Sequence, residues 1–580
     1  MDRKTAPPPV AQEIATYAID HDRCRHCGRS SCGQRCDQGV TEGFERAMAR
    51  ARSLEVGRDE QRPLIAPCAD KCPLFLCIQG YAAHITAGRY ADALELIMSG
   101  LPLPDSVCRV CHRPCETACV LVDQPVAIND LKRFVMEWAD GQEDFPYQPR
   151  GEPRNGMSVA VVGAGPAGLA ASHELAMRGY NVRLFDAADR PGGVLATAIP
   201  PYRLPPEVLR RDIRRILDLG VVFEGNRRLG DDMHIEELLG ENDAIMLAIG
   251  ADDTIDLDLG GRGPEVIQGL TYLESDTAPA ERVVVVGGGN TAIDAARTAL
   301  RRGATEVVIA CLEDRAEMAA IGSEILASAR EGVEIRTGLR AVGLVGGGIQ
   351  MTRVAPRVPG NTDPENYEAI EDSDVTLAAD LIIVAIGQRP DRSILRRGEV
   401  VPASSTEFQV DDETGGTAHE RVFAAGDLTG TGGTVTDAIA GGLRAAWGID
   451  RSLRGPAKAD ERTPPPRVTS APAAGRPGVA RVDVSKRAAP PELQPEQRVK
   501  NSAEVTGTFT EQQARAEASR CMICGLCGNC SACVDLFGCP AFYVEDGQIE
   551  IDPALCVVCG VCAQFCPNDA IYPVLLTGVP

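Results

Sequence analysis

The chain is poor in positive charge and in long apolar runs, and each shortage excludes a class of protein. Its 580 residues hold 59 Lys and Arg against 82 Asp and Glu, a formal net charge of −23, which excludes a nucleic-acid-binding role. No apolar run reaches the ~18 residues that a membrane-spanning helix needs, so we expect no direct membrane insertion. The N-terminal MDRKTAPPPVAQE lacks the apolar core of a secretory signal. We therefore expect a cytoplasmic protein with reduced cysteines.

Cysteine is the residue that the chain has in excess. Of its 22 cysteines, eleven lie between Cys24 and Cys119, ten lie between Cys521 and Cys566, and Cys311 stands alone between the two groups. Clustered cysteines in a reduced chain indicate metal or catalytic sites rather than disulfides. The long middle region is instead rich in Gly, Val and Ala.

The first strand–glycine–helix signal of this middle region is SVAVVGAGPAG, residues 158–168. In such a turn Gly163 permits the tight bend, Gly165 lets a pyrophosphate approach the backbone, and Gly168 allows close packing of helix on strand. Asp186 ends the next strand, where a carboxylate can accept a hydrogen bond from a ribose 2′-OH. The pattern predicts a dinucleotide site.

A second copy of this pattern begins at Arg282, with Gly287, Gly289 and Ala292 in the three small-residue positions. The following strand ends at Glu313. A carboxylate there bonds a free 2′-OH and repels a 2′-phosphate, which favours NAD over NADP. The alternative is that Glu313 is only a solvated turn residue.

The C-terminal cysteines have ferredoxin spacing. One run is C-x2-C-x2-C-x3-C-P and the run before it is C-x2-C-x2-C-x5-C-P. In two-cluster ferredoxins the fourth cysteine of each run binds the other [4Fe–4S] cluster. We therefore predict one cluster on Cys527, Cys530, Cys533 and Cys566, and a second on Cys556, Cys559, Cys562 and Cys539. Zinc knuckles are the alternative, and they usually pair two CxxC hooks. The roles of Cys521 and Cys524, just before these runs, stay open.

Five stretches resemble glutamate synthase small subunits and their relatives: VVGAGPAGL, RPGGVLATAIPPYRLP, VVVVGGGNTAIDAAR, LIIVAIGQRP and VFAAGDLTG. The resemblance covers most of residues 65–450. It implies FAD in the first dinucleotide site and a nicotinamide cofactor in the second, with Asp427 near the flavin ribityl and pyrophosphate and Val435 near the ring. That family often has Tyr-Arg-Arg where this chain has Cys311, Leu312 and Glu313, and this departure puts an NADP preference in doubt.

Motif and resemblance together give the predicted cofactor-binding residues. For FAD they are Gly163, Gly165, Pro166, Ala167, Gly168, Asp186, Gly193, Arg203, Gly426, Asp427, Thr434 and Val435. For NAD, or its interface with the flavin, they are Gly287, Gly289, Asn290, Thr291, Ala292, Glu313 and Gly387. No general acid or base is predicted.

In the N-terminal segment the same resemblance implies [4Fe–4S] clusters, carried over to Cys68, Cys72, Cys111, Cys115 and Cys119. One relative, dihydropyrimidine dehydrogenase, uses a glutamine as a non-cysteine ligand. The aligned residue here is Lys132, which cannot serve, and this leaves Cys77 or Cys108 as substitutes. Further out, Cys24, Cys27, Cys32 and Cys36 form C-x2-C-x4-C-x3-C. This run has its own cluster, contributes to the next one, or binds zinc with His26; iron–sulfur is favoured because the rest of the chain is redox-active.

The predicted fold is α/β: two doubly wound dinucleotide-binding domains, the NAD domain inserted in the FAD domain, with an N-terminal helical Fe–S domain and a C-terminal ferredoxin-like α+β domain. Nine prolines between Pro456 and Pro495 indicate a linker before the ferredoxin domain. The predicted boundaries are 1–155 for the helical Fe–S domain, 156–280 and 386–451 for the FAD domain, 281–385 for the NAD domain, 452–508 for the linker, and 509–580 for the ferredoxin domain.

The predicted function is electron transfer between NAD(H) and a partner. Nicotinamide passes a hydride, a cluster passes single electrons, and FAD converts one into the other. The body has no CxxC pair beside the flavin, so the electrons need another acceptor. Residues 527–571 resemble the tail of indolepyruvate ferredoxin oxidoreductase, which favours a 2-oxoacid oxidoreductase complex (aryl-glyoxylate or pyruvate type) that reduces NAD+. The alternatives are a glutamate synthase small subunit, a ferredoxin:NAD(P) oxidoreductase, bifurcating or not, and, last, a non-enzymatic zinc scaffold.

Overall fold

The computed structural model describes most of the chain between residues 66 and 521 and short pieces outside it. The described ranges are 16–19, 66–119, 121–145, 147, 149, 151–251, 253–391, 410–430, 433–455, 486–521, 541–545, 548–552, 555 and 571–574. Within these ranges, every helix is too short or too polar to serve as a transmembrane span.

The N-terminal domain is built from short helices, as predicted. They are α2 (Pro67–Lys71), α3 (Ile78–Thr86), α4 (Tyr90–Met98), α5 (Pro104–Val110), α6 (Pro114–Thr117) and α7 (Ile128–Asp140). Proline at the first helical position starts α2, α5 and α6, where its missing N–H costs no hydrogen bond. Each of these three helices contains a cysteine or lies next to one. The prolines therefore determine where the helices of the cysteine runs begin.

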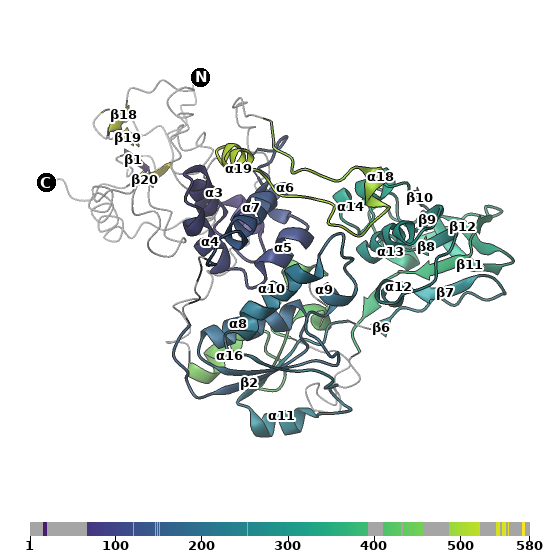
Figure 1. Cartoon of the computed structure of the whole chain (residues 1–580), viewed down its shortest axis with the longest axis horizontal. Coiled ribbons are helices and arrows are strands. Elements are labelled where there is room, and N and C mark those ends of the chain that lie inside the picture. Colours follow the sequence, from purple (N-terminus) through teal and green to yellow (C-terminus); the bar gives the residue numbers. More distant parts are fainter. Residues whose placement is uncertain are drawn as a thin grey trace, which may run out of the picture.

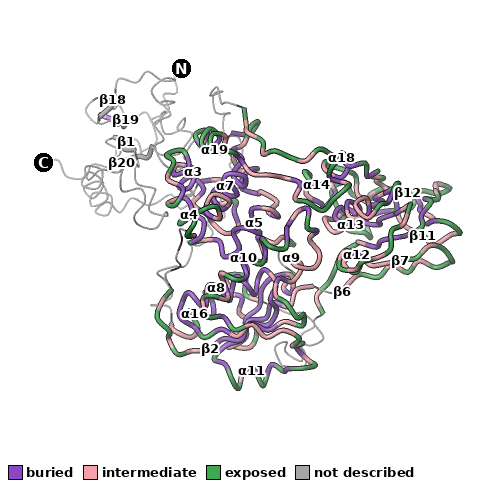
Figure 2. Tube along the Cα trace, viewed as in Figure 1, coloured by how far each residue is buried: buried purple, intermediate pink, exposed green. Residues whose placement is uncertain are grey.

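The FAD domain is a parallel five-stranded sheet in the order β17-β5-β2-β3-β4. Its strands are β2 (Ser158–Val162), β3 (Asn181–Phe185), β4 (Val222–Glu224), β5 (Ala244–Leu247) and β17 (Val422–Ala424). Its helices are α8 (Pro166–Met177), α9 (Val194–Thr197), α10 (Pro206–Leu217), α11 (Ile235–Glu241), the 3-10 turn η4 (Gly426–Thr429) and α16 (Val435–Arg454). Strands β2 and β5 are apolar and buried over nearly their whole length, as expected for a parallel sheet covered on both faces (Figure 2).

The NAD domain has a second parallel sheet, in the order β10-β9-β8-β15-β7. Its elements are β7 (Glu265–Gln268), α12 (Gly269–Glu274), β8 (Arg282–Val286), α13 (Asn290–Arg301), β9 (Glu306–Ala310), α14 (Gly322–Arg330), β10 (Glu334–Arg336) and β15 (Leu381–Val384). Helices α12 to α14 cover one face. An antiparallel sheet covers the other, made of β11 (Leu339–Val345), β12 (Gly348–Pro356), β13 (Tyr367–Ala369) and β14 (Val375–Ala378), with the 3-10 turn η3 (Pro364–Asn366).

The NAD domain begins earlier than the boundary placed at residue 281. Strand β7 belongs to the NAD sheet, where it pairs with β15, although it lies in the range assigned to the FAD domain. The chain crosses between the domains at a short antiparallel pair, β6 (Asp253–Thr254) with β16 (Gln388–Arg389). The sequence does not indicate this earlier start of the NAD domain, because β7 precedes the glycine turn and has no fingerprint of its own.

Part of the predicted linker is packed rather than extended. Residues 486–521, here called the strap, include α18 (Pro495–Arg498) and α19 (Glu511–Ala518). Figure 1 shows the strap reaching from the N-terminal domain to the NAD domain, where α18 lies near α14, and returning to the N-terminal domain, where α19 lies against α3 and α7. Ion pairs hold much of it: Glu504 bonds Arg109 and Arg133, at 2.9 and 2.8 Å. A stretch with few apolar residues is thus ordered by charge pairs, which composition alone does not reveal.

Glu517 is the residue that closes the strap onto the N-terminal domain. Its carboxylate is almost fully buried and accepts hydrogen bonds from the backbone N–H groups of Ala127 and Ala488, both at 2.8 Å, and from Arg520 at 2.5 Å. We expect Glu517→Ala to release the strap, because each bond to a buried carboxylate contributes about 1.5–3 kcal/mol. Hydrogen exchange of residues 486–521 should accelerate at least tenfold. Glu496→Ala, an exposed glutamate in α18, is the control, and equal exchange in both variants would contradict the prediction.

The two ends of the chain meet in a small sheet. Strand β1 (Thr16–Ile19) pairs antiparallel with β20 (Ile571–Val574), and β18 (Phe542–Glu545) pairs with β19 (Gln548–Ile551). Residues 16–19 were assigned to the N-terminal helical domain, but they pair with the ferredoxin end of the chain.

Candidate functional site

The first glycine turn has the shape that a bound pyrophosphate requires. Gly163 has φ +103°, and a Cβ on it would collide with the carbonyl oxygen of Ala248. A Cβ on Gly168 would collide with the carbonyl oxygen of Gly163. Only glycine therefore lets α8 begin directly above the strand end, with its free N–H groups facing the position of the phosphates. The turn fits FAD.

Other residues predicted for FAD gather at this turn. Asp186 accepts a hydrogen bond from the backbone N–H of Ala164 at 2.6 Å, so its carboxylate lies beside the turn. A Cβ on Gly193 would come within 2.8 Å of the Cα of Gly165, so these two backbones approach closely. Gly426, which follows the edge strand β17, also lies near this turn: a Cβ on it would lie 3.0 Å from the Cβ of Ala167.

Helix α16 begins at residues that the sequence predicts to bind FAD. Thr434 caps it by accepting a hydrogen bond from the backbone N–H of Asp437, and Val435 is its first residue. Burial and the nearby Asp437 raise the pKa of Asp427. The roles of Thr434, Val435 and Asp427 in binding FAD stay predictions.

Arg203 forms an ion pair between the two dinucleotide-binding domains. Its guanidinium forms an ion pair with Asp294 of helix α13 at 2.5 Å, and the side chain is buried. Burial raises the pKa of Asp294 to about 6 despite the neighbouring arginines. Arg203 thus joins the FAD domain to the NAD domain, a partnership that its place in the motif does not reveal.

The second glycine turn has a carboxylate directly beside it. A Cβ on Gly287, which has φ +134°, would collide with the carbonyl oxygen of Ala385. A Cβ on Gly288 would lie 2.8 Å from Oε2 of Glu313, so the Glu313 side chain lies over the turn itself. Asn290, at the start of α13, accepts a hydrogen bond from the backbone N–H of Ile321 at 2.9 Å, which fixes the loop beside the turn. Burial and Glu313 raise the pKa of Cys311 to about 12, so this thiol stays protonated.

Three N-terminal cysteines come together from two runs. Helices α2 and α6 pack on each other, and Cys72, just after α2, lies close enough to Cys111 and Cys115 to affect their pKa values. Burial raises the pKa of Cys115, and Cys72 and Cys111 raise it further. The hydroxyl of Tyr81 is buried among cysteines of both runs and has no hydrogen-bond partner in the part of the chain that the structure describes. Thiols from two runs around an unpaired buried hydroxyl fit an iron–sulfur cluster, whose sulfurs accept hydrogen bonds.

Among the described residues, no three Cys, His, Asp or Glu side chains converge on a point that would hold a single metal ion. Cys68, Cys77, Cys108 and Cys119 are also described in this domain. The remaining predicted ligands lie outside the described residues: Cys24, Cys27, Cys32, Cys36, Cys527, Cys530, Cys533, Cys539, Cys556, Cys559, Cys562 and Cys566.

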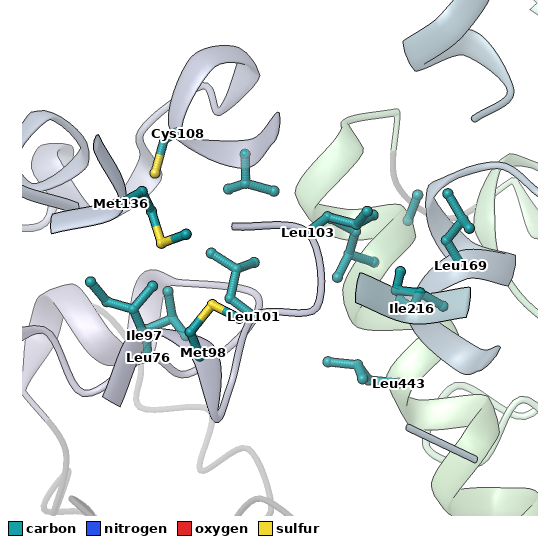
Figure 3. Packing of buried hydrophobic residues seen from close by; sticks show 14 of the residues in the cluster. Leu76, Ile97, Met98, Leu101, Leu103, Cys108, Met136, Leu169, Ile216 and Leu443 are labelled. Atoms are coloured by element: carbon teal, nitrogen blue, oxygen red, sulfur yellow. The ribbon is translucent and has the colours of Figure 1, made fainter. Parts of the chain in front are cut away.

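The cysteine domain and the FAD domain share one hydrophobic core. Figure 3 shows Leu103, just before α5, packed toward Leu169 of α8 and Ile216 of α10. Asp212 of α10 caps α5 from the other domain: its carboxylate accepts from the backbone N–H of Ser106 at 2.7 Å. Burial and Asp105 raise the pKa of Asp212 to about 7. The two domains therefore form one continuous unit at this contact.

His112 connects the cysteine segment to helix α16 of the FAD domain. It follows Cys111, and its Nδ1 lies 3.5 Å from Oγ1 of Thr436 in the first turn of α16. Burial lowers the pKa of His112. Only the adjacency to Cys111 indicates this contact in the sequence. Tyr81 is connected to the cysteines in the sequence only by its position in the helix after Cys77.

Family models match three parts of the chain. Residues 157–442 match the pyridine nucleotide-disulphide oxidoreductase model, residues 64–144 match dihydropyrimidine dehydrogenase domain II with its 4Fe-4S cluster, and residues 549–572 match a 4Fe-4S binding domain. These matches define the class: a flavin- and NAD(P)-binding iron–sulfur oxidoreductase. The predicted fold class is thereby confirmed, and so are FAD, a nicotinamide nucleotide and [4Fe–4S] clusters as cofactors, whereas the choice of NAD(H) stays a prediction.

Named relatives narrow the class. The chain is 34% identical to the beta subunit of NADP(+)-dependent formate dehydrogenase of Moorella thermoacetica, over 84% of this chain and 74% of that one. It is 32% identical to the glutamate synthase [NADPH] small chain of Azospirillum brasilense, over 68% and 87%. It is 30% identical to the NAD-dependent dihydropyrimidine dehydrogenase subunit PreT of Escherichia coli K12, over 67% and 92%. The chain belongs to the family of FAD and iron–sulfur oxidoreductases that contains these glutamate synthase small chains and formate dehydrogenase beta subunits.

Proposed function

We propose that this chain is an electron-transfer subunit that exchanges a hydride with NAD(H) at its flavin and passes single electrons through its cysteine-bound clusters to a partner enzyme. The observation that carries the proposal is the contact of the Cys111–His112 segment with the first turn of α16. FAD, when bound, takes up electrons in pairs and releases them singly. The chain's own residues bind and orient: the α8 turn holds the dinucleotide, and the shared core around Leu103 fixes the cysteines beside it.

The test is reduction of the purified full-length chain by NADH in the absence of oxygen. The flavin absorbance should bleach, and the electron paramagnetic resonance spectrum should then show reduced clusters. NADH should also reduce an artificial dye. Bleaching of the flavin without any reduced cluster would contradict the proposed route, and a protein that purifies without flavin would contradict the function itself.

We further propose that the chain prefers NAD(H) over NADP(H). The position of the Glu313 carboxylate over Gly288 supports this, because a carboxylate there accepts from a free 2′-OH and repels a 2′-phosphate. Relatives of both preferences exist, since two of those named above carry NADP or NADPH in their names and one carries NAD.

Glu313→Arg should reverse this preference. Losing a hydrogen bond to a charged group costs about 1.5–3 kcal/mol, so kcat/KM for NADH should fall roughly ten- to a hundredfold while that for NADPH rises. Dye reduction with each nucleotide measures both values. Asp314→Ala removes the neighbouring exposed carboxylate and should leave the ratio unchanged. An unchanged ratio in Glu313→Arg would show that Glu313 is only a turn residue.

For the partner we propose a 2-oxoacid oxidoreductase complex, which the resemblance of residues 527–571 to the indolepyruvate ferredoxin oxidoreductase tail supports. Copurification of the full chain with a thiamine-diphosphate enzyme, and 2-oxoacid-dependent reduction of NAD+ by the complex, would support this partner. Copurification with a glutamine amidotransferase or a formate dehydrogenase would contradict it.

A further inference from the structure

Lys132 is a buried cation in the core of the cysteine domain. It lies in α7, and only 5% of its surface is exposed. The groups that act on its ammonium group are cysteines of both runs: Cys108, Cys111, Cys115 and Cys72.

The buried carboxylates of this domain are already used by arginines. Asp130 forms two hydrogen bonds with Arg113, at 2.9 and 3.0 Å. Glu116 pairs with Arg487 of the strap at 2.5 Å, and Asp105 pairs with Arg215. Among the described residues, none of these carboxylates forms an ion pair with Lys132.

An ammonium group buried without a counter-ion costs several kcal/mol, so this position requires an anion. An iron–sulfur cluster with four thiolate ligands is such an anion, and it gains a further negative charge when it is reduced. Thiols alone, which are neutral, do not supply the charge.

We propose that Cys72, Cys108, Cys111 and Cys115 hold one [4Fe–4S] cluster, with Cys108 as its fourth ligand, and that Lys132 is a positioning residue whose buried ammonium raises the reduction potential of that cluster. The geometry fits, because Cys108 is 2% exposed and lies one helical turn before Cys111, in α5 packed against α7. In the step concerned, the cluster gains one electron from the reduced flavin; no bond forms or breaks and no proton moves. The positive charge favours the more negative, reduced form.

This inference deepens the proposed function, but its test does not use NADH. The full-length variants Lys132→Met, Lys132→Gln and Lys132→Arg are reduced stepwise with dithionite, and each cluster is followed by electron paramagnetic resonance. We expect Lys132→Met to shift the reduction equilibrium of one cluster toward the oxidised form at least tenfold, which is about 60 mV for one electron. Lys132→Arg keeps the charge, so its reduction equilibrium should stay close to that of the wild type.

Lys71→Met is the matched control. Lys71 directly precedes Cys72 but is exposed, so water and salt screen its charge and its removal should change the equilibrium less than about threefold. A shift below threefold in both Lys132→Met and Lys132→Gln, with normal iron content, would overturn the proposal. If the neutral variants lose the cluster while Lys132→Arg keeps it, the charge requirement is supported. Loss of the cluster in all three variants would show that Lys132 has only a packing role, and this result would overturn the proposal.

The ligand assignment has its own test in iron and acid-labile sulfide content. Cys108→Ala should lose about one cluster or convert it to a three-iron form, whereas Cys77→Ala and Cys311→Ala should retain it. The reverse result, with loss in Cys77→Ala only, would make Cys77 the fourth ligand and overturn the assignment. Failure of the proposed function would be seen separately, in wild-type protein whose clusters NADH does not reduce.

Discussion

Gly168→Ala protein is expected to purify with under about a tenth of the wild-type flavin and to lose NADH-dependent dye reduction in proportion. The added methyl group would collide with the carbonyl oxygen of Gly163 and would lie 3.3 Å from a methyl group of Val161. Neither can give way cheaply, because Gly163 is itself confined by the backbone of Ala248 and Val161 is fully buried in the central strand.

A displacement of α8 relieves such a collision, and that displacement removes the cofactor. The N-terminal N–H groups of α8 bind the pyrophosphate only when the helix begins directly above the turn. The N-terminal end of α8 packs on α16, where a Cβ on Gly442 would collide with the carbonyl oxygen of Ala167, so the helix cannot shift without also disturbing the residues around Gly426.

Gly240→Ala is the matched control for this substitution. Gly240 lies in helix α11 of the same domain, and a Cβ there has nothing within 4 Å. Alanine is favoured over glycine inside a helix, so this variant should keep its flavin and its stability. The ratio of flavin absorbance to protein absorbance measures the flavin content of both variants. A normal ratio in Gly168→Ala would show that the turn does not hold FAD in the way proposed.

The parts that the sequence predicted correctly are those fixed by local geometry. Gly163, Gly168 and Gly287 were recognisable because a tight turn between strand and helix excludes a Cβ, whatever the rest of the chain does. The ferredoxin spacing has the same local character, although those cysteines lie outside the described residues. The covering antiparallel sheet of residues 339–378 has no comparable fingerprint, and the resemblance alone did not predict it.

The features that cannot be predicted from the sequence depend on pairs of residues far apart in the chain. The bond between Arg203 and Asp294 is one example, because the two residues lie 91 positions apart and in different domains. Lys132 was seen only as a residue unable to replace a glutamine ligand, since its burial among the thiols of two separate runs requires α5 and α7 to pack. The strap was read as linker because its order depends on residues such as Ala127, which are nearly four hundred positions before it.

Asp450→Ala is expected to lower the free energy of unfolding of the FAD domain by about 3–5 kcal/mol, the usual cost of removing one partner from a buried ion pair. Asp450 lies fully buried in α16 and ties three groups together. It accepts from Arg178 at 2.7 Å, from the Tyr180 hydroxyl at 2.9 Å, and from Arg454 at 2.5 Å. Its removal leaves the Tyr180 hydroxyl unpaired and deprives two arginines of a carboxylate at the joint between α8, β3 and α16.

The pH dependence identifies the carboxylate as the source of this stability. Burial raises the pKa of Asp450, but bonds from Arg454, Arg178 and Tyr180 outweigh it and hold the pKa below its ordinary value. Such a group stabilises the folded state above its unfolded pKa of about 3.9 and ceases to do so as the pH falls through the folded value. The difference between wild type and Asp450→Ala should therefore be constant from neutral pH down to about 5 and should shrink below about 4.

Urea unfolding followed by far-ultraviolet circular dichroism and by release of flavin fluorescence measures the difference. Glu241→Ala supplies the control, because Glu241 pairs with Arg183 at 2.7 Å on the surface of the same domain and should change stability by under about 1 kcal/mol. A loss in Asp450→Ala no larger than that in Glu241→Ala would contradict the assignment. Asp450→Asn should fall between the two, since it keeps an acceptor for Tyr180 but leaves the charges of Arg178 and Arg454 with less compensation, and this order separates the hydrogen bond from the ion pair.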